Sequence, residues 1–514
     1  MEKDRSFSII KTSLSLSCVL LIAKFISFIR DMLLARNLGA TIYSDVFLAS
    51  NSILMVFVSF ILSPFAAAYI PVATDYYLKE NTKTKNEFFG TVYGTVIILG
   101  LIVIILEYIF VEEIIQIVTP GFDAISQQLL AKIIYIQLPI ILMVFLSGVN
   151  NGNLRLINKF NIAEISNIFA PLVCILYLII RKSETSIIEL SICVVIGYFL
   201  ALLLQFYVIK ENGINPKINF KFTHKEGLKQ ITAAMAPFMI SGVARELNAL
   251  IDKTIGSVLS EGSVTILSYA SKITTTEVGL ISTAISLVVF SQMSKQNSLH
   301  DIDGLRRSIV QAIKFVNTII IPTSVLTIVL RRDIVTILFG GGAFDKESIE
   351  ITANTMMFYA IGMFGFGMQD VLTRGMHATK HRRFPAIMSV VMVGINIVLN
   401  LLFYKRLKTY GLALATSMAV LCTIPFLYLY LTKKVISIKK EDKILKDTCF
   451  TIVSSVIMGG AAFGVDKVVY KITESNLYSL ICSGVIAILV YVICMIISGN
   501  EFIINCIKKV NFNK

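Results

Sequence analysis

The chain has 514 residues, of which 55% are hydrophobic and only 16% are charged, and its mean hydropathy is +0.77. A soluble globular protein carries about 25% charged residues, so this composition excludes a soluble multidomain enzyme. The net charge of +14 is typical of a membrane protein with basic cytoplasmic loops, so we do not expect nucleic acid as a partner.

Apolar runs recur along the whole chain, each bounded by charged residues or by Gly and Pro. A run of roughly 20 apolar residues can cross a bilayer as one helix. In chain order, we expect spans over 11–36, 45–71, 88–111, 126–150, 160–180, 187–209, 231–258, 263–291, 309–330, 349–376, 384–404, 410–432, 448–466 and 477–498. The sequence thus predicts an all-α polytopic membrane protein with 14 transmembrane helices.

Short sequence matches recur at almost one spacing along the chain. Asp31 recurs as Asp252, 221 residues later, and the Asp that ends 116–123 recurs as Asp345, 222 residues later. A constant offset indicates duplication, and an even number of helices in each unit keeps the two units in one orientation. We therefore expect two pseudo-symmetric six-helix lobes plus two extra helices.

The repeat also predicts the domain organisation. The segments are an N-lobe at 1–209 (helices 1–6), a cytoplasmic linker at 210–230, a C-lobe at 231–432 (helices 7–12), a basic cytoplasmic loop at 433–447, and helices 13–14 with the C-terminal tail at 448–514. An even number of spans places both termini on one side, and the loops of that side carry most of the Lys and Arg. We therefore expect both termini in the cytoplasm.

Ionisable residues within the predicted spans point to a polar cavity. Helix 1 carries Lys24, Ser27 and Asp31 on one face, and helix 7 carries Arg245, Asn248 and Asp252 at the same spacing. Charges in lipid cost several kcal/mol, so they normally face a cavity or a partner, and such cavities lie between transporter repeats. Other charges of this set are Arg30, Arg36, Asp45, Glu246, Lys253 and Lys272. Because basic groups outnumber acidic ones, we expect the cavity to prefer an anion such as phosphate.

Two further polar groups have a structural and a functional interpretation. Asp370 and Arg374 are spaced i, i+4 on helix 10, which favours an ion pair that stabilises the helices. Asn396 and Asn400 on helix 11 and Thr416 on helix 12 could hydrogen-bond between helices, or could coordinate a small cation together with Asp252.

Several segments resemble the MurJ (MviN) family, the lipid II flippases of the MOP exporter superfamily. The opening of the family is similar to Phe28–Ala40, Ser44–Ala49 and Pro64–Pro71. Further similar segments are 119–123, 261–270, 384–385, 396–402 and 411–417. The resemblance implies two six-helix lobes around a cationic cavity for a lipid-linked sugar pyrophosphate. It also implies that helices 13 and 14 form a groove for the polyprenyl tail.

The resemblance carries over to individual residues. It implies substrate-binding roles for Lys24, Arg30 and Asp31 on helix 1, for Asp45 at the start of helix 2, and for Lys272 on helix 8. With Arg36 and Arg245 added from the charge pattern, these residues are the predicted substrate-binding set. A sodium site of the family resembles Asp252, Asn396, Asn400 and Thr416, with Asn400 where Asp is usual.

The predicted function is translocation of lipid II, an undecaprenyl-pyrophosphate-linked peptidoglycan precursor, from the inner to the outer leaflet by alternating access. The alternative is a flippase for another lipid-linked polysaccharide of the O-antigen or capsule type. It is favoured by Met55–Val58, which stands where the family has an arginine pair. A cation or drug antiporter would need an acidic cavity, which the basic excess argues against.

No metalloprotease motif, P-loop or catalytic triad pattern is found in the sequence, so we do not expect an enzyme. The expected partners are the lipid-linked glycan pyrophosphate and membrane lipids. The protein is expected as a monomer in the bacterial plasma membrane, with sodium as the one candidate for a bound or coupling ion.

Overall fold

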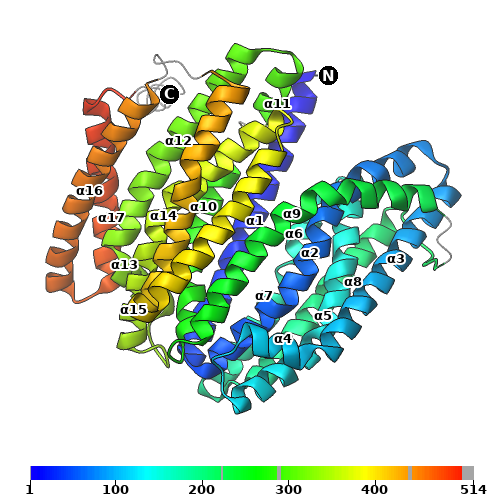
Figure 1. Cartoon of the computed structure of the whole chain (residues 1–514), viewed down its shortest axis with the longest axis horizontal. Helices are drawn as coiled ribbons and strands as arrows, with labels where there is room; N and C mark the ends of the chain where they lie inside the picture. The colour runs from blue at the N-terminus through cyan, green and yellow to red at the C-terminus, as the bar shows by residue number, and fades with distance from the viewer. Residues whose placement is uncertain (1, 221–223, 286–290, 438–442, 501–514) are drawn as a thin grey trace. The chain divides into compact units, whose positions relative to one another are not determined.

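The computed structural model describes residues 2–220, 224–285, 291–437 and 443–500, apart from some side chains within these ranges. Helices make up almost all of this part of the chain, and no strand occurs in it (Figure 1). The helices are α1 (Glu2–Leu38), α2 (Ile42–Lys79), α3 (Thr82–Ile109), α4 (Val111–Val118), α5 (Ala124–Leu156), α6 (Phe160–Ser166), α7 (Phe169–Arg181), α8 (Ile187–Glu211), α9 (Lys225–Ser257), α10 (Ser263–Ile285), α11 (Ser291–Ser298), α12 (Ile302–Val329), α13 (Arg331–Phe339), α14 (Lys346–Ala378), α15 (Arg383–Tyr430), α16 (Ile444–Thr473) and α17 (Asn476–Ile497). The predicted all-α class is confirmed.

The predicted count of 14 spans is not confirmed. Within the described ranges, eight helices are long and apolar enough to cross a membrane. Where the structure describes them, the predicted spans nevertheless overlap helices, and three of the spans differ in detail. The span predicted at 160–180 is broken into α6 and α7, and the spans at 384–404 and 410–432 are the two arms of α15, which bends at Lys408, where φ is 49°.

The chain forms two compact units. The first comprises residues 1–265 with 342–344, and the second comprises 266–341 with 345–514. In the first unit, α9 lies along α2, and α2 also packs on α5 (Figure 1). The predicted lobe boundaries divide the chain by the order of its helices, whereas these units are defined by contacts. The lobe boundaries therefore stay a prediction.

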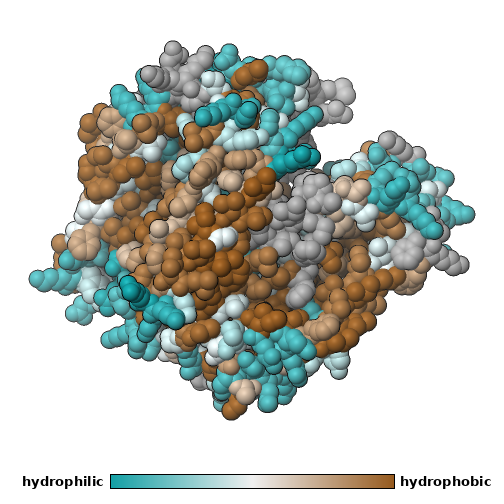
Figure 2. Space-filling model, in the orientation of Figure 1, coloured by the Kyte–Doolittle hydropathy of each residue, from teal (hydrophilic) through white to brown (hydrophobic). Residues whose placement is uncertain are grey.

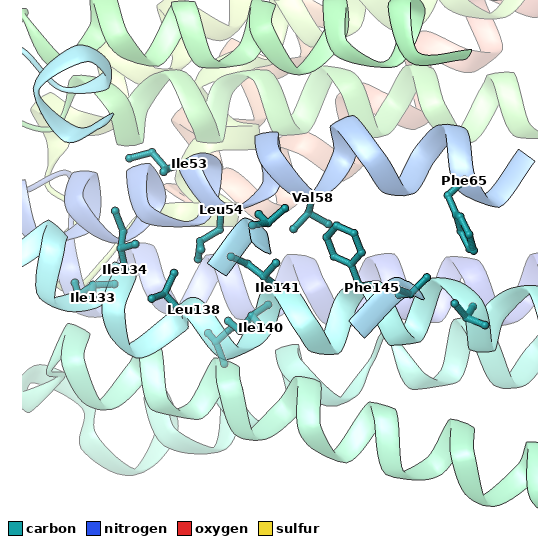
Figure 3. Packing of buried hydrophobic residues seen from close by; sticks show 14 of the residues in the cluster. Ile53, Leu54, Val58, Phe65, Ile133, Ile134, Leu138, Ile140, Ile141 and Phe145 are labelled. Atoms are coloured by element: carbon teal, nitrogen blue, oxygen red, sulfur yellow. The ribbon is translucent and has the colours of Figure 1, made fainter. Parts of the chain in front are cut away.

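α2 and α5 face each other in the core of the first unit, to which α3, α7 and α8 also contribute. Figure 3 shows their apolar side chains facing one another, with Ile53, Leu54, Val58 and Phe65 from α2 and Ile133, Ile134, Leu138, Ile140, Ile141 and Phe145 from α5. Glycine allows a close approach in this interface, because a Cβ added at Gly148 would lie 2.1 Å from Leu62 Cδ1. Such close-packed interiors hold side chains in single rotamers, which gives the polar residues of this unit fixed positions.

The second unit adds a helix pair to its bundle. α16 and α17 pack on each other and on α12, where Met458, Ala487 and Met495 form a buried cluster with Val325 and Val329. On the visible face of this unit, hydrophobic side chains cover the middle of the helices and hydrophilic ones gather near their ends (Figure 2). This distribution is the one expected for helices that cross a bilayer.

Two close backbone contacts in the first unit involve residues that the predicted repeat relates to one another. A Cβ at Gly342 would lie 2.1 Å from the carbonyl oxygen of Arg36, and a Cβ at Gly121 would lie 2.1 Å from that of Ser257. Both residue pairs are related by an offset of 221, from Arg36 to Ser257 and from Gly121 to Gly342. The same close contact is thus made twice by equivalent residues, which supports a duplicated chain.

Candidate functional site

A cavity of about 390 Å³ with a mixed polar and apolar lining lies in the first unit, between α1, α2, α5, α6, α7 and α8. Its polar lining consists of Ser27, Arg30, Asn51, Ser147, Asn151, Ser166, Asn167, Tyr198 and Gln205. Arg30 is the one ionisable residue among these that carries a full charge at neutral pH. The cavity therefore combines one fixed cation with many neutral donors and acceptors.

Arg30 is held by its neighbour on α1. Its Nη2 and Nε donate to Asp31 Oδ1 at 2.6 and 2.9 Å. The Asp31 side chain is 3% exposed, whereas that of Arg30 is 27% exposed. A guanidinium has five N–H donors, and this pair uses two of them, so Arg30 can still donate to an anion. Two of the predicted binding residues are therefore brought together, with Arg30 on the cavity and Asp31 behind it.

A network of amides and phenols supports the cavity. Gln205 Nε2 donates to Ser166 Oγ at 2.7 Å and to Asn151 Oδ1 at 3.2 Å, and Asn150 Nδ2 donates to Gln205 Oε1 at 3.2 Å. Deeper in the unit, Asn150 accepts from the Tyr93 hydroxyl and Asn153 Oδ1 accepts from the Tyr69 hydroxyl. Sequence analysis missed these residues, although the run Asn-Asn-Gly-Asn at 150–153 within an apolar helix was a visible signal.

Asp45, predicted as a binding residue at the start of helix 2, accepts hydrogen bonds from the start of α10. Its Oδ2 accepts from the Gly262 backbone at 2.8 Å, and its Oδ1 accepts from the backbone and hydroxyl of Thr265 at 2.7 and 2.5 Å. A second hydrogen bond joins the same two segments, because Glu261 Oε1 accepts from the Ile42 backbone N–H at 2.8 Å. The buried Asp45 carboxylate thus caps the N-terminus of α10, where the helix dipole favours negative charge. It does not line the cavity described above, and its predicted role in substrate binding remains untested.

The remaining predicted cations are spread over the chain. Lys24 is exposed on α1, one turn before Ser27, which lines the cavity. Arg36 lies at the end of α1, where its carbonyl accepts from the Ala343 backbone at 2.8 Å. Arg245 belongs to α9, but its side chain lies outside the described residues. Lys272 lies on α10 within the second unit.

The residues of the predicted sodium site divide between the two units. In the second unit, Asn400 Nδ2 donates to Asn396 Oδ1 at 2.9 Å, and Asn396 Nδ2 donates to Thr416 Oγ1 at 3.0 Å. Asp252 is buried on α9 in the first unit, next to Lys253, whose ammonium donates to Ser52. The three neutral side chains use one another as partners, which fits interhelical hydrogen bonding better than coordination of a cation. The sodium site stays a prediction.

The predicted ion pair on helix 10 is present. Arg374 Nε lies 2.9 Å from Asp370 Oδ2 within α14, and both side chains are about one-third exposed. A pair at this spacing on one helix stabilises it by a few tenths of a kcal/mol. It belongs to the second unit and is separate from the cavity at Arg30.

Comparison with known proteins identifies the family. The family model described as "Lipid II flippase MurJ" matches residues 34–502. A protein named "Probable lipid II flippase MurJ" from Buchnera aphidicola subsp. Schizaphis graminum is 28% identical over 449 residues, which cover 85% of this chain and 86% of that protein. One of the same name from Rickettsia prowazekii is 26% identical over 434 residues, covering 83% and 84% of the two chains.

Solved structures agree at the level of the fold. The structure titled "Lipid II flippase MurJ, inward closed conformation" matches with a TM-score of 0.78 at 24% identity, covering 95% of this chain and 99% of that one. An inward-facing multidrug resistance MATE family transporter of the MOP superfamily matches with a TM-score of 0.68 at 12% identity, covering 81% and 98%. The chain is therefore a multi-pass membrane protein with the fold of these transporters, and it belongs to the MurJ family of lipid II flippases.

Proposed function

We propose that this chain is a flippase that moves lipid II from the inner to the outer leaflet by alternating access. The observation that carries the proposal is the match of the lipid II flippase model to residues 34–502. The polar cavity at Arg30 adds a chemical reason, because the substrate joins an anionic pyrophosphate to a polar sugar-peptide head.

In this proposal, Arg30 binds the pyrophosphate. A guanidinium presents paired donors that match two phosphate oxygens, and it stays charged at every physiological pH. Asp31 acts as a positioning residue, because its carboxylate fixes the orientation of the guanidinium at 2.6 Å. Asn51 and Asn167 line the cavity with amide groups that can bind the neutral part of the head. Lys24, Arg36, Arg245 and Lys272 are proposed as further cations that attract the anionic group.

Complementation with single variants tests the role of Arg30. We expect Arg30→Ala to abolish rescue of a flippase-depleted strain, and Arg30→Lys to restore it in part, because Lys keeps the charge without the paired donors. Lys471→Ala, which removes one cation from an exposed position at the end of α16, is the matched control. Full rescue by Arg30→Ala at normal protein level would refute the assigned role.

A transport assay with two substrates tests the proposed headgroup. Purified protein in liposomes should move lipid II and should not move an undecaprenyl-pyrophosphate carrying an O-antigen or capsule unit. The family match favours lipid II over this alternative. Movement of the other glycan alone would establish the alternative, for which Met55–Val58 would then be the sequence signal.

Topology, oligomeric state and activity class complete the proposal. We propose a monomer with both termini in the cytoplasm of a bacterial cell, without enzymatic activity and without nucleic acid as a partner. The basic loop at 433–447 supports this orientation. Labelling of single cysteines at the two termini from either side of the membrane tests it, and labelling from outside alone would reverse it.

Sodium is the one ion proposed for this protein, at Asn396, Asn400 and Thr416 with Asp252. A thermal-shift titration with sodium chloride against potassium chloride tests it. A sodium-specific rise in unfolding temperature that is lost in Asn396→Ala would support the site, and equal effects of the two salts would argue against it.

A further inference from the structure

The amide network beside the cavity has a direction, which one backbone carbonyl determines. The Ser166 hydroxyl donates to the Ala163 carbonyl oxygen at 2.7 Å. A hydroxyl has one hydrogen, so Ser166 Oγ can only accept from its other partner, Gln205, which lies at 2.7 Å. The atom of Gln205 that contacts Ser166 is therefore Nε2, and this contact fixes the orientation of the whole amide.

The orientation of Gln205 determines that of its partners on α5. Gln205 Oε1 accepts from Asn150 Nδ2, and Gln205 Nε2 donates a second time, to Asn151 Oδ1, both at 3.2 Å. Asn150 is also fixed from its other side, because its Oδ1 accepts from the Tyr93 hydroxyl. The oxygen of that hydroxyl accepts from Asn153 Nδ2 at 3.1 Å. Hydrogen bonds from two sides thus require the same orientation of these amides.

Asn151 lines the cavity with the end of its amide that the network does not use. Its Oδ1 accepts from Gln205, and its Nδ2 donates to none of the protein groups that the structure describes. The two other asparagines of the cavity are used in the opposite sense, since Asn51 donates to a backbone carbonyl at 2.9 Å and Asn167 donates to Glu164 at 3.3 Å. Asn151 therefore keeps both of its N–H groups for a ligand, whereas Asn51 and Asn167 keep their carbonyl oxygens.

A comparison with its neighbours on α5 separates Asn151 from the structural amides. Asn150 and Asn153 are buried, and both ends of each side chain are paired within the protein. Asn151 is only partly buried, and one end of its side chain is paired. A buried amide needs partners at both ends, so the unpaired end of Asn151 is explained by its place on the cavity.

The chemistry of Asn151 matches that of Arg30, the cation of the same cavity. Arg30 uses two of its five N–H groups on Asp31, so both residues present donors and no unused acceptor. Oxygens of an ionised pyrophosphate only accept, and a donor bound to a charged oxygen forms a hydrogen bond about twice as strong as a neutral one. A pyrophosphate carries oxygens on two phosphorus atoms, so it can accept from Arg30 and from Asn151 together.

We propose that Asn151 is a further substrate-binding residue that donates to an oxygen of the pyrophosphate, and that Gln205 is the positioning residue that keeps its N–H groups available to the ligand. This inference rests on the proposed function, because it names a second contact to the same anionic group. It holds for lipid II and for the alternative lipid-linked glycans alike, since the pyrophosphate is common to them.

Binding of two lipids to the purified full-length protein tests the proposal. Undecaprenyl pyrophosphate carries the anion without a glycan, undecaprenol carries neither, and the measured quantity is the ratio of their dissociation constants. Asn151→Asp exchanges the N–H donors for an anionic oxygen, so it should reduce the preference for the pyrophosphate by about tenfold to a hundredfold. Asn212→Asp, the same substitution at an exposed position directly after α8, is the matched control and should leave the ratio unchanged.

Two further variants separate positioning from stability. In Gln205→Glu the new carboxylate has no N–H to donate, so Asn151 should turn its amide toward it, and the preference should fall by about tenfold. Tyr93→Phe leaves Asn150 Oδ1 without its donor and should lower the unfolding temperature. It should leave the ratio unchanged, because Ser166 still fixes Gln205. A structural role alone would lower the unfolding temperature in both variants and change the ratio in neither.

The outcomes distinguish this inference from the proposed function. A wild-type protein that binds the two lipids equally would refute the pyrophosphate site itself, and with it the chemical reason given for the proposed function. A wild-type preference that persists in Asn151→Asp would overturn the role of Asn151 alone. If Asn151→Asp does not fold, Asn151→Leu, which also lacks the donors, should show the same loss of preference, and a full preference in that variant would overturn the inference equally.

Discussion

The polar residues at the cavity of the first unit and those at the bend of α15 in the second unit differ in charge. In the first unit, the ion pair of Arg30 and Asp31 borders a polar cavity, and the carboxylate of Asp45 is buried at a helix end. In the second unit, Asn396, Asn400 and Thr416 form a neutral hydrogen-bonded chain within α15. The comparison teaches that an ion pair with a buried member and a chain of neutral side chains should respond differently to the loss of one residue.

The largest expected loss of stability comes from Asp45→Ala in the first unit. It removes three hydrogen bonds to a buried carboxylate and leaves the donors of Gly262 and Thr265 unpaired, which costs about 3 kcal/mol. Thermal unfolding in detergent measures this loss. Asp45→Asn, which keeps one acceptor oxygen, should lose less, and an unchanged unfolding temperature for Asp45→Ala would contradict the capping role.

Arg30→Ala should destabilise the first unit by about 2 kcal/mol, because it removes the guanidinium that donates twice to the buried Asp31 carboxylate. This loss is smaller than for a fully buried pair, since Arg30 is partly exposed. The double variant Arg30→Ala/Asp31→Asn should recover most of the stability in the same unfolding assay while transport remains absent. Recovery of transport as well would show that the pair serves stability alone.

A smaller effect is expected for the neutral chain of the second unit. Asn396→Ala removes the acceptor of Asn400 and the donor to Thr416, at a cost of about 1 kcal/mol. The unfolding temperature in potassium chloride measures this cost without any contribution from sodium. A loss as large as that of Asp45→Ala would mean that the two units do not differ as described.

The smallest effect is expected for Asp370→Asn on α14. The ion pair with Arg374 is partly exposed and lies within one helix, so its loss should cost about 0.5 kcal/mol or less. Complementation should be unaffected and the unfolding temperature nearly unchanged. Loss of transport in this variant would reveal a function for the pair that its geometry does not suggest.

The sequence was a good guide to helices because apolar runs and breaks follow from local chemistry. It placed the bend near Lys408 between two predicted spans, and it paired Asp370 with Arg374 from their spacing alone. The break between the two spans and the ion pair could both be predicted without knowledge of distant contacts, since the spacing of residues on a helix is fixed by its geometry.

The site was harder to predict because its geometry depends on partners that are distant in the sequence. The hydrogen bonds of Asp45 could not be predicted from the sequence, because its donors lie 217 and 220 residues away at the start of α10. The amide network of Asn150 and Gln205 was missed for the same reason. The role of a neutral polar residue depends on its hydrogen-bond partners, and these two partners are distant in the sequence.

The amide and phenol network of the first unit has a mechanical consequence. It connects α2, α3, α5, α6 and α8 through directional bonds at one level, from Tyr69 and Tyr93 to Gln205 and Ser166. Gly152 adds to this stiffness, because a Cβ there would lie 2.6 Å from the Tyr69 ring. If the two lobes of a transporter move against each other, each lobe has to keep its internal packing. Hydrogen bonds that join five helices allow these helices to move together as one rigid body.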